Sequence, residues 1–183
     1  GFPNITNVCR IPASPDYEEE ATVTATIKDD VAIDESLLSF TFNSIWHNVT
    51  MNRYGDAFSA TIPAQPYGIA VQYKIHANDT YGNWATSELY SYTVGDFVPP
   101  EVKLSQIPDY PFPEQKVEVY ANVTEPSTAS GVKTPVFFSY RVNGEAWWNT
   151  TMKFNGALGL YEITVPAYGK HDSIEYFVKA TDN

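Results

Sequence analysis

The stretch AVQYKIHANDTYGN, from Ala70 to Asn83, decides the fold. Its first eight residues place apolar side chains at every second position, with Gln, Lys and His between them. Because side chains on a strand alternate between its two faces, this pattern predicts a β-strand with one buried face. The residues that follow, NDTYGN, belong to types that bond their own backbone or tolerate a positive φ. The stretch therefore predicts a half-buried strand that ends in a tight turn.

Nearly the same pattern returns as SIEYFVKATDN, from Ser173 to Asn183. Other features recur in the same order along the chain. The matching pairs are Tyr73 with Tyr176, Asp79 with Asp182, Trp46–Met51 with Trp147–Met152, and Pro15-Asp16-Tyr17 with Pro108-Asp109-Tyr110. A shared order of features indicates a tandem duplication of one module.

Turn-forming residues separate short alternating segments along the whole chain, and no segment shows a helical period. Turn signals at intervals of about 8–12 residues predict antiparallel β-sandwiches. The sequence Phe-Val-Pro-Pro after Asp96 predicts a short, semi-rigid joint, because proline fixes φ. We therefore expect an all-β chain with one sandwich over residues 1–96 and a second over residues 97–183.

The two copies differ in how they end. In the first copy the turn leads to a further predicted strand, ELYSYTV, from Glu88 to Val94, whereas the second copy stops at Asn183, inside the turn. We therefore expect the second sandwich to lack its final strand within this chain. Two explanations stay open: the sequence is an excerpt, or another subunit supplies the strand.

The layout resembles the immunoglobulin-like and fibronectin type III-like modules of bacterial and archaeal surface proteins. The resemblance is carried by Pro66-Tyr67-Gly68 and by the Tyr-x-Ile-x-Ala-x-Asp-x-x-Gly-Asn pattern of residues 73–83. It implies stalks, surface-layer domains, adhesin spacers or accessory domains of secreted hydrolases, because sandwiches host many functions. The second copy departs from the pattern, since it lacks the Gly-Asn pair and the closing strand.

Charge and sequons predict an extracellular setting. The net charge of −11 argues against nucleic acid and anionic membrane surfaces as partners. No apolar run approaches the ~18 residues of a membrane span, so we expect no membrane insertion within this segment. Asn-x-Thr sequons occur where chance predicts roughly two, at Asn4, Asn48, Asn78, Asn122 and Asn149. Although Asn and Thr are also common in turns and strands, we interpret the sequons as N-glycosylation sites on a cell surface.

The single cysteine, Cys9, excludes an internal disulfide. Glycosylation without disulfides fits an archaeal cell surface better than an animal one. Cys9 has no partnered motif, so we expect a small, buried or half-buried side chain rather than a nucleophile. The three histidines lack the spacing of a zinc site, and no nucleophile elbow, phosphate loop or dinucleotide fingerprint is present. We therefore expect no enzymatic activity, no catalytic residue and no cofactor.

Two binding alternatives accompany this interpretation. Clustered carboxylates are weak calcium candidates, with ordinary turn chemistry as the competing explanation; they are Asp29, Asp30, Asp79, Asp96 and Glu101, of which the last three are expected to converge near the joint. Trp46 and the pair Trp147-Trp148 suggest either a sugar-binding platform or a contact to a neighbouring domain.

The sequence thus predicts a structural segment of an extracellular surface protein: a spacer, a surface-layer or filament subunit, or an adhesin stalk. It would act through neighbouring domains of the same protein or identical subunits. The alternative is a carbohydrate-binding or spacer module of a secreted enzyme. Exposed aromatic residues clustered in one groove would favour this alternative.

Overall fold

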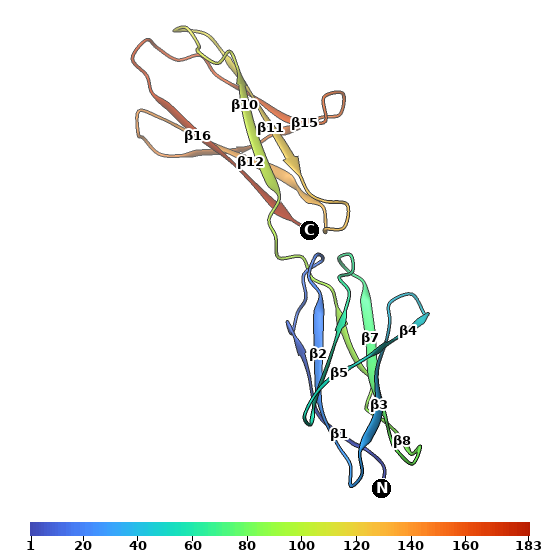
Figure 1. Ribbon diagram of the computed structural model, residues 1–183. Helices are drawn as coiled ribbons and strands as arrows, with labels where there is room; N and C mark the ends of the chain where they lie inside the picture. Colours follow the sequence, from blue (N-terminus) through green and yellow to red (C-terminus); the bar gives the residue numbers. More distant parts are fainter. The chain divides into compact units, whose positions relative to one another are not determined.

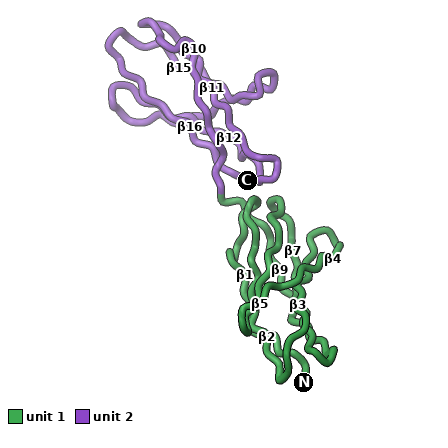
Figure 2. The backbone as a smooth tube through the Cα atoms, viewed as in Figure 1, with its two compact units in different colours: residues 1–97 green, residues 98–183 purple.

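The chain folds as two compact units, Gly1–Phe97 and Val98–Asn183 (Figure 2). A computed structural model describes all residues from 1 to 183 and shows an all-β chain without a helix (Figure 1). It follows that no helix in the chain is suited to crossing a membrane. The predicted fold class, tandem antiparallel β-sandwiches, is confirmed.

Unit 1 is built from two antiparallel sheets. The first sheet has the order β1-β2-β6-β5, with strands β1 (Asn4–Ile11), β2 (Ala21–Lys28), β6 (Ala57–Ile62) and β5 (Asn52–Tyr54). The second sheet has the order β4-β3-β7-β8, and β9 also pairs with β7; its strands are β4 (Trp46–Thr50), β3 (Ile33–Thr41), β7 (Ala70–Asp79), β8 (Trp84–Thr86) and β9 (Tyr90–Thr93).

The core of unit 1 follows from the alternating burial of side chains along β2 and β7. Every second residue of β2, beginning with Ala21, is buried, and so is every second residue of β7, beginning with Val71. Val23 and Val71 are both fully enclosed. Burial of apolar surface at roughly 25 cal/mol per Å² makes this interior the main source of stability.

Unit 2 repeats the plan with fewer strands. Its first sheet has the order β10-β11-β15-β14, with strands β10 (Glu101–Ile107), β11 (Val117–Thr124), β15 (Leu160–Val165) and β14 (Lys153–Asn155). Its second sheet has the order β13-β12-β16, with strands β13 (Trp148–Thr151), β12 (Val132–Val142) and β16 (Ile174–Asp182).

The strand order confirms the resemblance to immunoglobulin-like and fibronectin type III-like modules. In unit 1 the first and second strands share a sheet with β6 and β5, while the third strand joins β7 and β9 in the other sheet. This division of strands is that of the immunoglobulin-like sandwich. In unit 2, β16 pairs with β12 on one side only. The prediction that the second module lacks its final strand within this chain is therefore also confirmed.

At one point of each unit, a single residue separates two strands that belong to different sheets. In unit 1, β4 pairs with β3, and immediately afterwards β5 pairs with β6. Met51 lies at the crossing, is buried, and donates its backbone N–H to the carbonyl of Ser36 at 2.9 Å. Met152 makes the same crossing in unit 2, with the carbonyl of Val136 as its acceptor at 2.9 Å.

One predicted match between the copies lies in the loop that follows the first strand of each unit. The backbone N–H of Glu19 donates to the carbonyl of Asp16, and the N–H of Gln115 donates to that of Phe112 in the same way. Asp16 therefore corresponds to Phe112, and the predicted match of Asp16 with Asp109 is wrong. In each unit the turn is defined by a backbone and a side-chain hydrogen bond between residues three positions apart, Asp16 with Glu19 and Phe112 with Gln115. The shared sequence Pro-Asp-Tyr lies at a different position of the loop in each unit.

Candidate functional site

The outer face of the second sheet in unit 1 carries a cluster of polar and aromatic side chains. Because Leu38 and Phe40 point into the core, Ser39 between them faces outward. The hydroxyl of Ser39 donates to Oδ1 of Asn48 on the paired strand at 2.6 Å. The Lys74 ammonium lies 4.9 Å from the centroid of the Trp46 ring, which is close enough for a cation–π contact. We call Ser39, Trp46, Asn48, Lys74 and His76 the outer strip of unit 1; together they border a cavity of ≈ 200 Å³.

Unit 2 carries a corresponding outer strip, consisting of Ser139, Arg141, Trp147, Asn149 and Glu175. Its serine hydroxyl again donates to Oδ1 of its asparagine, at 2.6 Å. Its cation again lies against a tryptophan, with the guanidinium carbon 4.8 Å from the ring centroid. In addition, the guanidinium donates two hydrogen bonds to the Glu175 carboxylate, at 3.1 and 2.7 Å. A similar serine–asparagine–tryptophan–cation group thus occurs once in each unit.

Sequence reasoning identified the tryptophans and asparagines of these strips but missed Ser39 and Ser139. A signal was available, because each serine lies two residues before the last outward-facing position of its strand, in both copies. The cations were not predictable in the same way. The lysine of unit 1 lies on β7, whereas the arginine of unit 2 lies on β12.

Charged neighbours shift the pKa values of several strip residues. The hydrogen bonds from Arg141 lower the pKa of Glu175, and those same bonds raise the pKa of Arg141. Burial lowers the pKa of His76, and the nearby Lys74 charge lowers it further. Nδ1 of His76 is 2.8 Å from the Thr86 hydroxyl oxygen. His76 is therefore held toward its neutral form, whereas the Arg141–Glu175 pair is held in its charged form.

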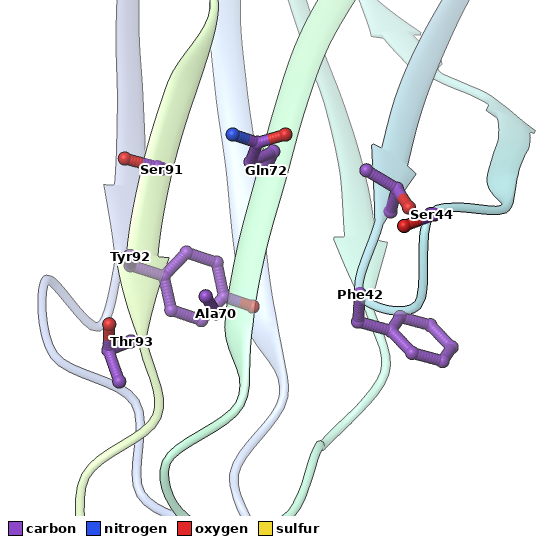
Figure 3. A pocket seen from close by; sticks show the side chains of 8 residues that line it. Phe42, Ser44, Ala70, Gln72, Ser91, Tyr92 and Thr93 are labelled. Atoms are coloured by element: carbon purple, nitrogen blue, oxygen red, sulfur yellow. The ribbon is translucent and has the colours of Figure 1, made fainter.

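A second cavity of unit 1, with a volume of ≈ 420 Å³, lies beside the outer strip on the same sheet. Figure 3 shows that its side chains come from β7, from β9, and from the end of β3 with the turn that follows it. Thr41 is among the residues that line this cavity, and its buried hydroxyl makes no hydrogen bond. Hydroxyl and amide groups are suited to hydrogen bonds with an uncharged polar ligand; the lining residues are Thr41, Phe42, Ser44, Ala70, Gln72, Ser91, Tyr92 and Thr93.

The five sequon asparagines lie in unequal surroundings. Asn4 on β1, Asn122 on β11, and the strip residues Asn48 and Asn149 are exposed. Asn78 is 9 % exposed, and its Oδ1 accepts a hydrogen bond from the Glu35 backbone N–H at 2.9 Å. A glycan on Asn78 would have to displace this packing. Glycan occupancy at all five positions stays a prediction.

Among the predicted calcium ligands, Asp79 has a structural role of its own. Its carboxylate accepts hydrogen bonds from the backbone of Tyr81 and Asn83 at 2.9 Å and from the Asn83 side chain at 2.8 Å. Burial opposes ionisation of Asp79, but these hydrogen bonds outweigh it and lower its pKa. Asp79 therefore organises the turn after β7, which is ordinary turn chemistry.

The predicted convergence of Asp79 with Asp96 is wrong. Asp79 ends β7, whereas the other end of β7, at Ala70, pairs with Thr93, which lies three residues before Asp96. A ten-residue strand at about 3.4 Å per residue therefore separates the two carboxylates.

The other three candidate carboxylates have partners of their own. Asp30 pairs with the N-terminal ammonium at 3.0 Å, and Glu101 pairs with Lys103 at 3.0 Å. One oxygen of Asp29 accepts a hydrogen bond from the Val31 backbone at 3.0 Å. Calcium binding by these residues and by Asp96 stays a prediction.

Cys9 is exposed, so the expectation of a buried or half-buried thiol is wrong. The pairing of β1 with β2 shifts register between Thr6 and Cys9, where Asn7 has a φ of 50°. This bulge turns Cys9 outward and places Arg10 over the Tyr92 ring, 4.2 Å from its centroid.

Comparisons with known proteins found similarity of structure only. No protein-family model and no curated protein sequence matches the chain. Among solved structures, a segment of two fibronectin type III domains from chicken tenascin is 14% identical, with all of both chains covered and a TM-score of 0.45. The fibronectin(III)-like modules of Clostridium thermocellum CbhA are 16% identical, with 95% of this chain and 86% of that chain covered and a TM-score of 0.36.

The FN1–FN3 domains of chicken CNTN1 are also 16% identical, with 97% of this chain covered and a TM-score of 0.37. The present chain covers 61% of that fragment. All three similar structures consist of fibronectin type III modules in tandem. The predicted prokaryotic origin of the chain stays a prediction.

Proposed function

We propose that this chain is a structural segment of an extracellular surface protein and acts through contacts with neighbouring domains or identical subunits. The observation that carries the proposal is the outer strip, which occurs with similar chemistry in both units. In each strip an exposed asparagine and an exposed tryptophan lie over a buried serine, and such a duplicated surface supports repeated contacts of one kind. The proposal covers a spacer, a surface-layer or filament subunit, and an adhesin stalk, and it includes no catalytic activity.

The chemistry of the strips suits such contacts. Trp46 and Trp147 are partly exposed, and each is covered on one side by a cation. Trp148, beside the second strip, is 67% exposed. Tryptophan and arginine are enriched where protein surfaces meet, because they combine apolar area with hydrogen-bond donors. The strips therefore supply anchoring residues for a neighbouring domain or subunit.

The proposal includes N-linked glycans on the exposed sequons. In both strips the serine hydroxyl binds the amide oxygen of the asparagine, which leaves the amide nitrogen free. That nitrogen is the atom to which an N-linked glycan is attached. Asn48 and Asn149 are therefore presented in the same way, and Asn4 and Asn122 are exposed as well. Glycans on Asn4 and Asn122 would keep an extracellular surface hydrated, whereas glycans on Asn48 and Asn149 would form part of the contact surface of the strips.

Surface proteolysis of intact native cells, followed by mass spectrometry of the released peptides, tests this proposal. We expect peptides of this chain in the released fraction, with glycan mass on Asn48 and Asn149 and none on the buried Asn78. Peptides that appear only after cell lysis, with all five asparagines bare, would contradict both the compartment and the glycans.

A second candidate function is a carbohydrate-binding or spacer module of a secreted enzyme. The observation that favours it is the pair of neighbouring cavities on the outer face of unit 1, one bordered by Trp46 and one lined by hydroxyl groups. Titration calorimetry against soluble polysaccharides tests this candidate. Binding that disappears in Trp46→Ala but survives in Trp84→Ala, whose tryptophan is 48% exposed outside the strip, would support it. No heat with any polysaccharide would remove it.

A further inference from the structure

Asn48 and Trp46 lie two residues apart on β4, so their side chains emerge on the same face of the sheet. That face is the outer one, because Asn48 lies opposite Ser39, which faces outward, and Trp46 lies opposite Thr41. Two residues of a strand span about 7 Å. An exposed indole ring therefore lies one sugar's width from a sequon asparagine.

The smaller cavity of unit 1, with a volume of ≈ 200 Å³, is bordered by both Asn48 and Trp46. Trp46 stays 43% exposed even with the Lys74 ammonium 4.9 Å from its ring centroid. One face of a pyranose ring presents C–H groups that pack on an aromatic ring, while the hydroxyl groups at its rim form hydrogen bonds. The cavity thus offers an aromatic wall to the first sugar of a glycan on Asn48.

A row of outward side chains leads from this wall into the larger cavity. Thr41 on β3 lies opposite Trp46 and, on its other side, opposite Gln72 of β7. Gln72 in turn lies opposite Ser91 of β9. Thr41, Gln72 and Ser91 all line the cavity of ≈ 420 Å³ (Figure 3). Because neighbouring strands are about 4.8 Å apart, the second and third sugars of a glycan on Asn48 reach this cavity.

The larger cavity holds a polar group that needs a partner. Thr41 is only 6% exposed, and its hydroxyl makes no hydrogen bond. Such a group is destabilising, and buried hydroxyls are normally hydrogen-bonded for that reason. The hydroxyl groups of a sugar supply the missing partner.

Unit 2 keeps the first part of this arrangement and replaces the second. Trp147 again lies two residues before a sequon asparagine. The positions of Thr41 and Gln72 are taken by Arg141 and Glu175, which are paired with each other through two hydrogen bonds. The face beside Trp147 therefore carries an ion pair where unit 1 has a cavity lined by hydroxyl and amide groups.

We infer that the N-linked glycan of Asn48 lies along the outer face of unit 1, with its first sugar packed on Trp46 and the following sugars in the cavity lined by Thr41 and Gln72. The glycan of Asn149 makes only the first of these contacts. This inference rests on the proposed function for the presence of the glycans and deepens it by naming the surface that one glycan covers. It assigns to a tethered sugar the cavities that the second candidate function assigns to a soluble polysaccharide.

Oxidation of the Trp46 side chain by hydroxyl radicals tests the first contact. The chain produced in its native cells is compared with Thr50→Ala, which removes the sequon but leaves Asn48 in place, and with Thr50→Ser, which keeps the sequon. Oxidation of Trp46, measured by mass spectrometry, should rise at least about twofold in Thr50→Ala, because the sugar no longer covers the ring. It should not change in Thr50→Ser. Equal oxidation in the glycosylated chain and in Thr50→Ala would overturn the inference.

The substitution Thr41→Val tests the contact in the larger cavity. In the Thr50→Ala background it removes an unpaired buried hydroxyl and should raise the melting temperature of unit 1. In the glycosylated chain it removes a hydrogen bond to the sugar and should lower the melting temperature. A shift in the same direction in both backgrounds would overturn the inference.

The matched control in unit 2 is Thr151→Ala, which removes the sequon of Asn149. It should raise the oxidation of Trp147, as Thr50→Ala does for Trp46. It should lower the melting temperature of its unit by less than Thr50→Ala does, because an ion pair occupies the place of the larger cavity. A larger loss in unit 2 would overturn the assignment of that cavity to the glycan.

Titration calorimetry with soluble polysaccharides distinguishes the tethered glycan from a free ligand. The glycosylated chain should give no heat, because the tether keeps the glycan at a high effective concentration in the cavities. Binding to the glycosylated chain that disappears in Trp46→Ala would overturn the inference and support the second candidate function.

The intact mass of the native chain separates the two possible failures. A bare Asn48 would contradict the glycan in the proposed function, and the inference would fall with it. A glycosylated Asn48 beside a fully accessible Trp46 would contradict the inference alone.

Discussion

β7 and β16 carry nearly the same alternating sequence but make different contributions to their units. The four inward residues of β7, from Val71 to Ala77, are buried, with Tyr73 only 3% exposed. The corresponding residues of β16, from Ile174 to Ala180, are all half-buried. The difference shows that alternation in sequence selects a strand and its inward face, whereas the depth of burial depends on the strand next to it.

The largest expected effect comes from removal of the corresponding tyrosines. Tyr73→Ala deletes a buried ring that stacks on Tyr90 at 5.3 Å, and we expect a loss of about 3–5 kcal/mol in the unfolding free energy of unit 1. Tyr176→Ala removes a half-buried ring and should cost unit 2 about 1–2 kcal/mol. Hydrogen exchange measured peptide by peptide reports each unit separately. Equal losses of unfolding free energy in the two variants would show that the neighbouring strand does not determine how much each tyrosine stabilises its unit.

The ends of the two strands offer a second contrast. Asp79→Ala removes a carboxylate that accepts three hydrogen bonds in the turn after β7, and it should lower the melting temperature of unit 1 by several degrees. The corresponding change in β16, Asp182→Ala, should have a smaller effect, because Oδ1 of Asp182 accepts no hydrogen bond. Scanning calorimetry of both variants provides the measurement, and a larger shift for Asp182→Ala would break the comparison.

The cations of the two outer strips should differ by a smaller amount. Arg141 contacts Trp147 and binds Glu175 through two hydrogen bonds, whereas Lys74 contacts Trp46 and lacks a carboxylate partner. We expect Arg141→Ala to destabilise its unit by more than Lys74→Ala does, and the difference should narrow in high salt because the carboxylate pair is exposed to screening. Melting curves at low and high ionic strength check this expectation. A difference that persists unchanged in high salt would contradict it.

The smallest effect is a pH dependence confined to unit 1. The pKa of folded His76 lies below its ordinary value of 6.5, so the unfolded chain binds more protons in this range. The stabilisation from neutral His76 is therefore complete above about pH 6.5 and declines as the pH falls toward the lowered folded value. Unit 2 has Lys179 in place of a histidine at the corresponding position of β16.

The control for this pH effect is His76→Gln. Unfolding of unit 1 at about pH 7 and about pH 5 should differ more in the parent chain than in this variant. If the difference is the same in both chains, His76 is not its source.

The strands and the duplication were predictable from sequence because both depend on local alternation and on order along the chain. Three other features depend on details that alternation does not encode. The bulge at Asn7 reverses the face of Cys9, the loop hydrogen bonds fix the match of Asp16, and the full length of β7 separates Asp79 from Asp96.

The outer strips show the same limit. Asn48 was recognisable as a sequon, but its serine partner lies on a different strand. Only strand pairing brings the two side chains together. The two cations were not predicted either, because Lys74 lies on β7 in unit 1 whereas Arg141 lies on β12 in unit 2.

The crossing at Met51 and Met152 has a mechanical consequence for each sandwich. The strands before and after each methionine belong to different sheets, so the backbone at this residue joins the two sheets covalently. The two sheets cannot separate there unless the buried methionine side chain becomes exposed and its backbone hydrogen bond is broken. This single-residue crossing is therefore the shortest covalent link between the two sheets of each module.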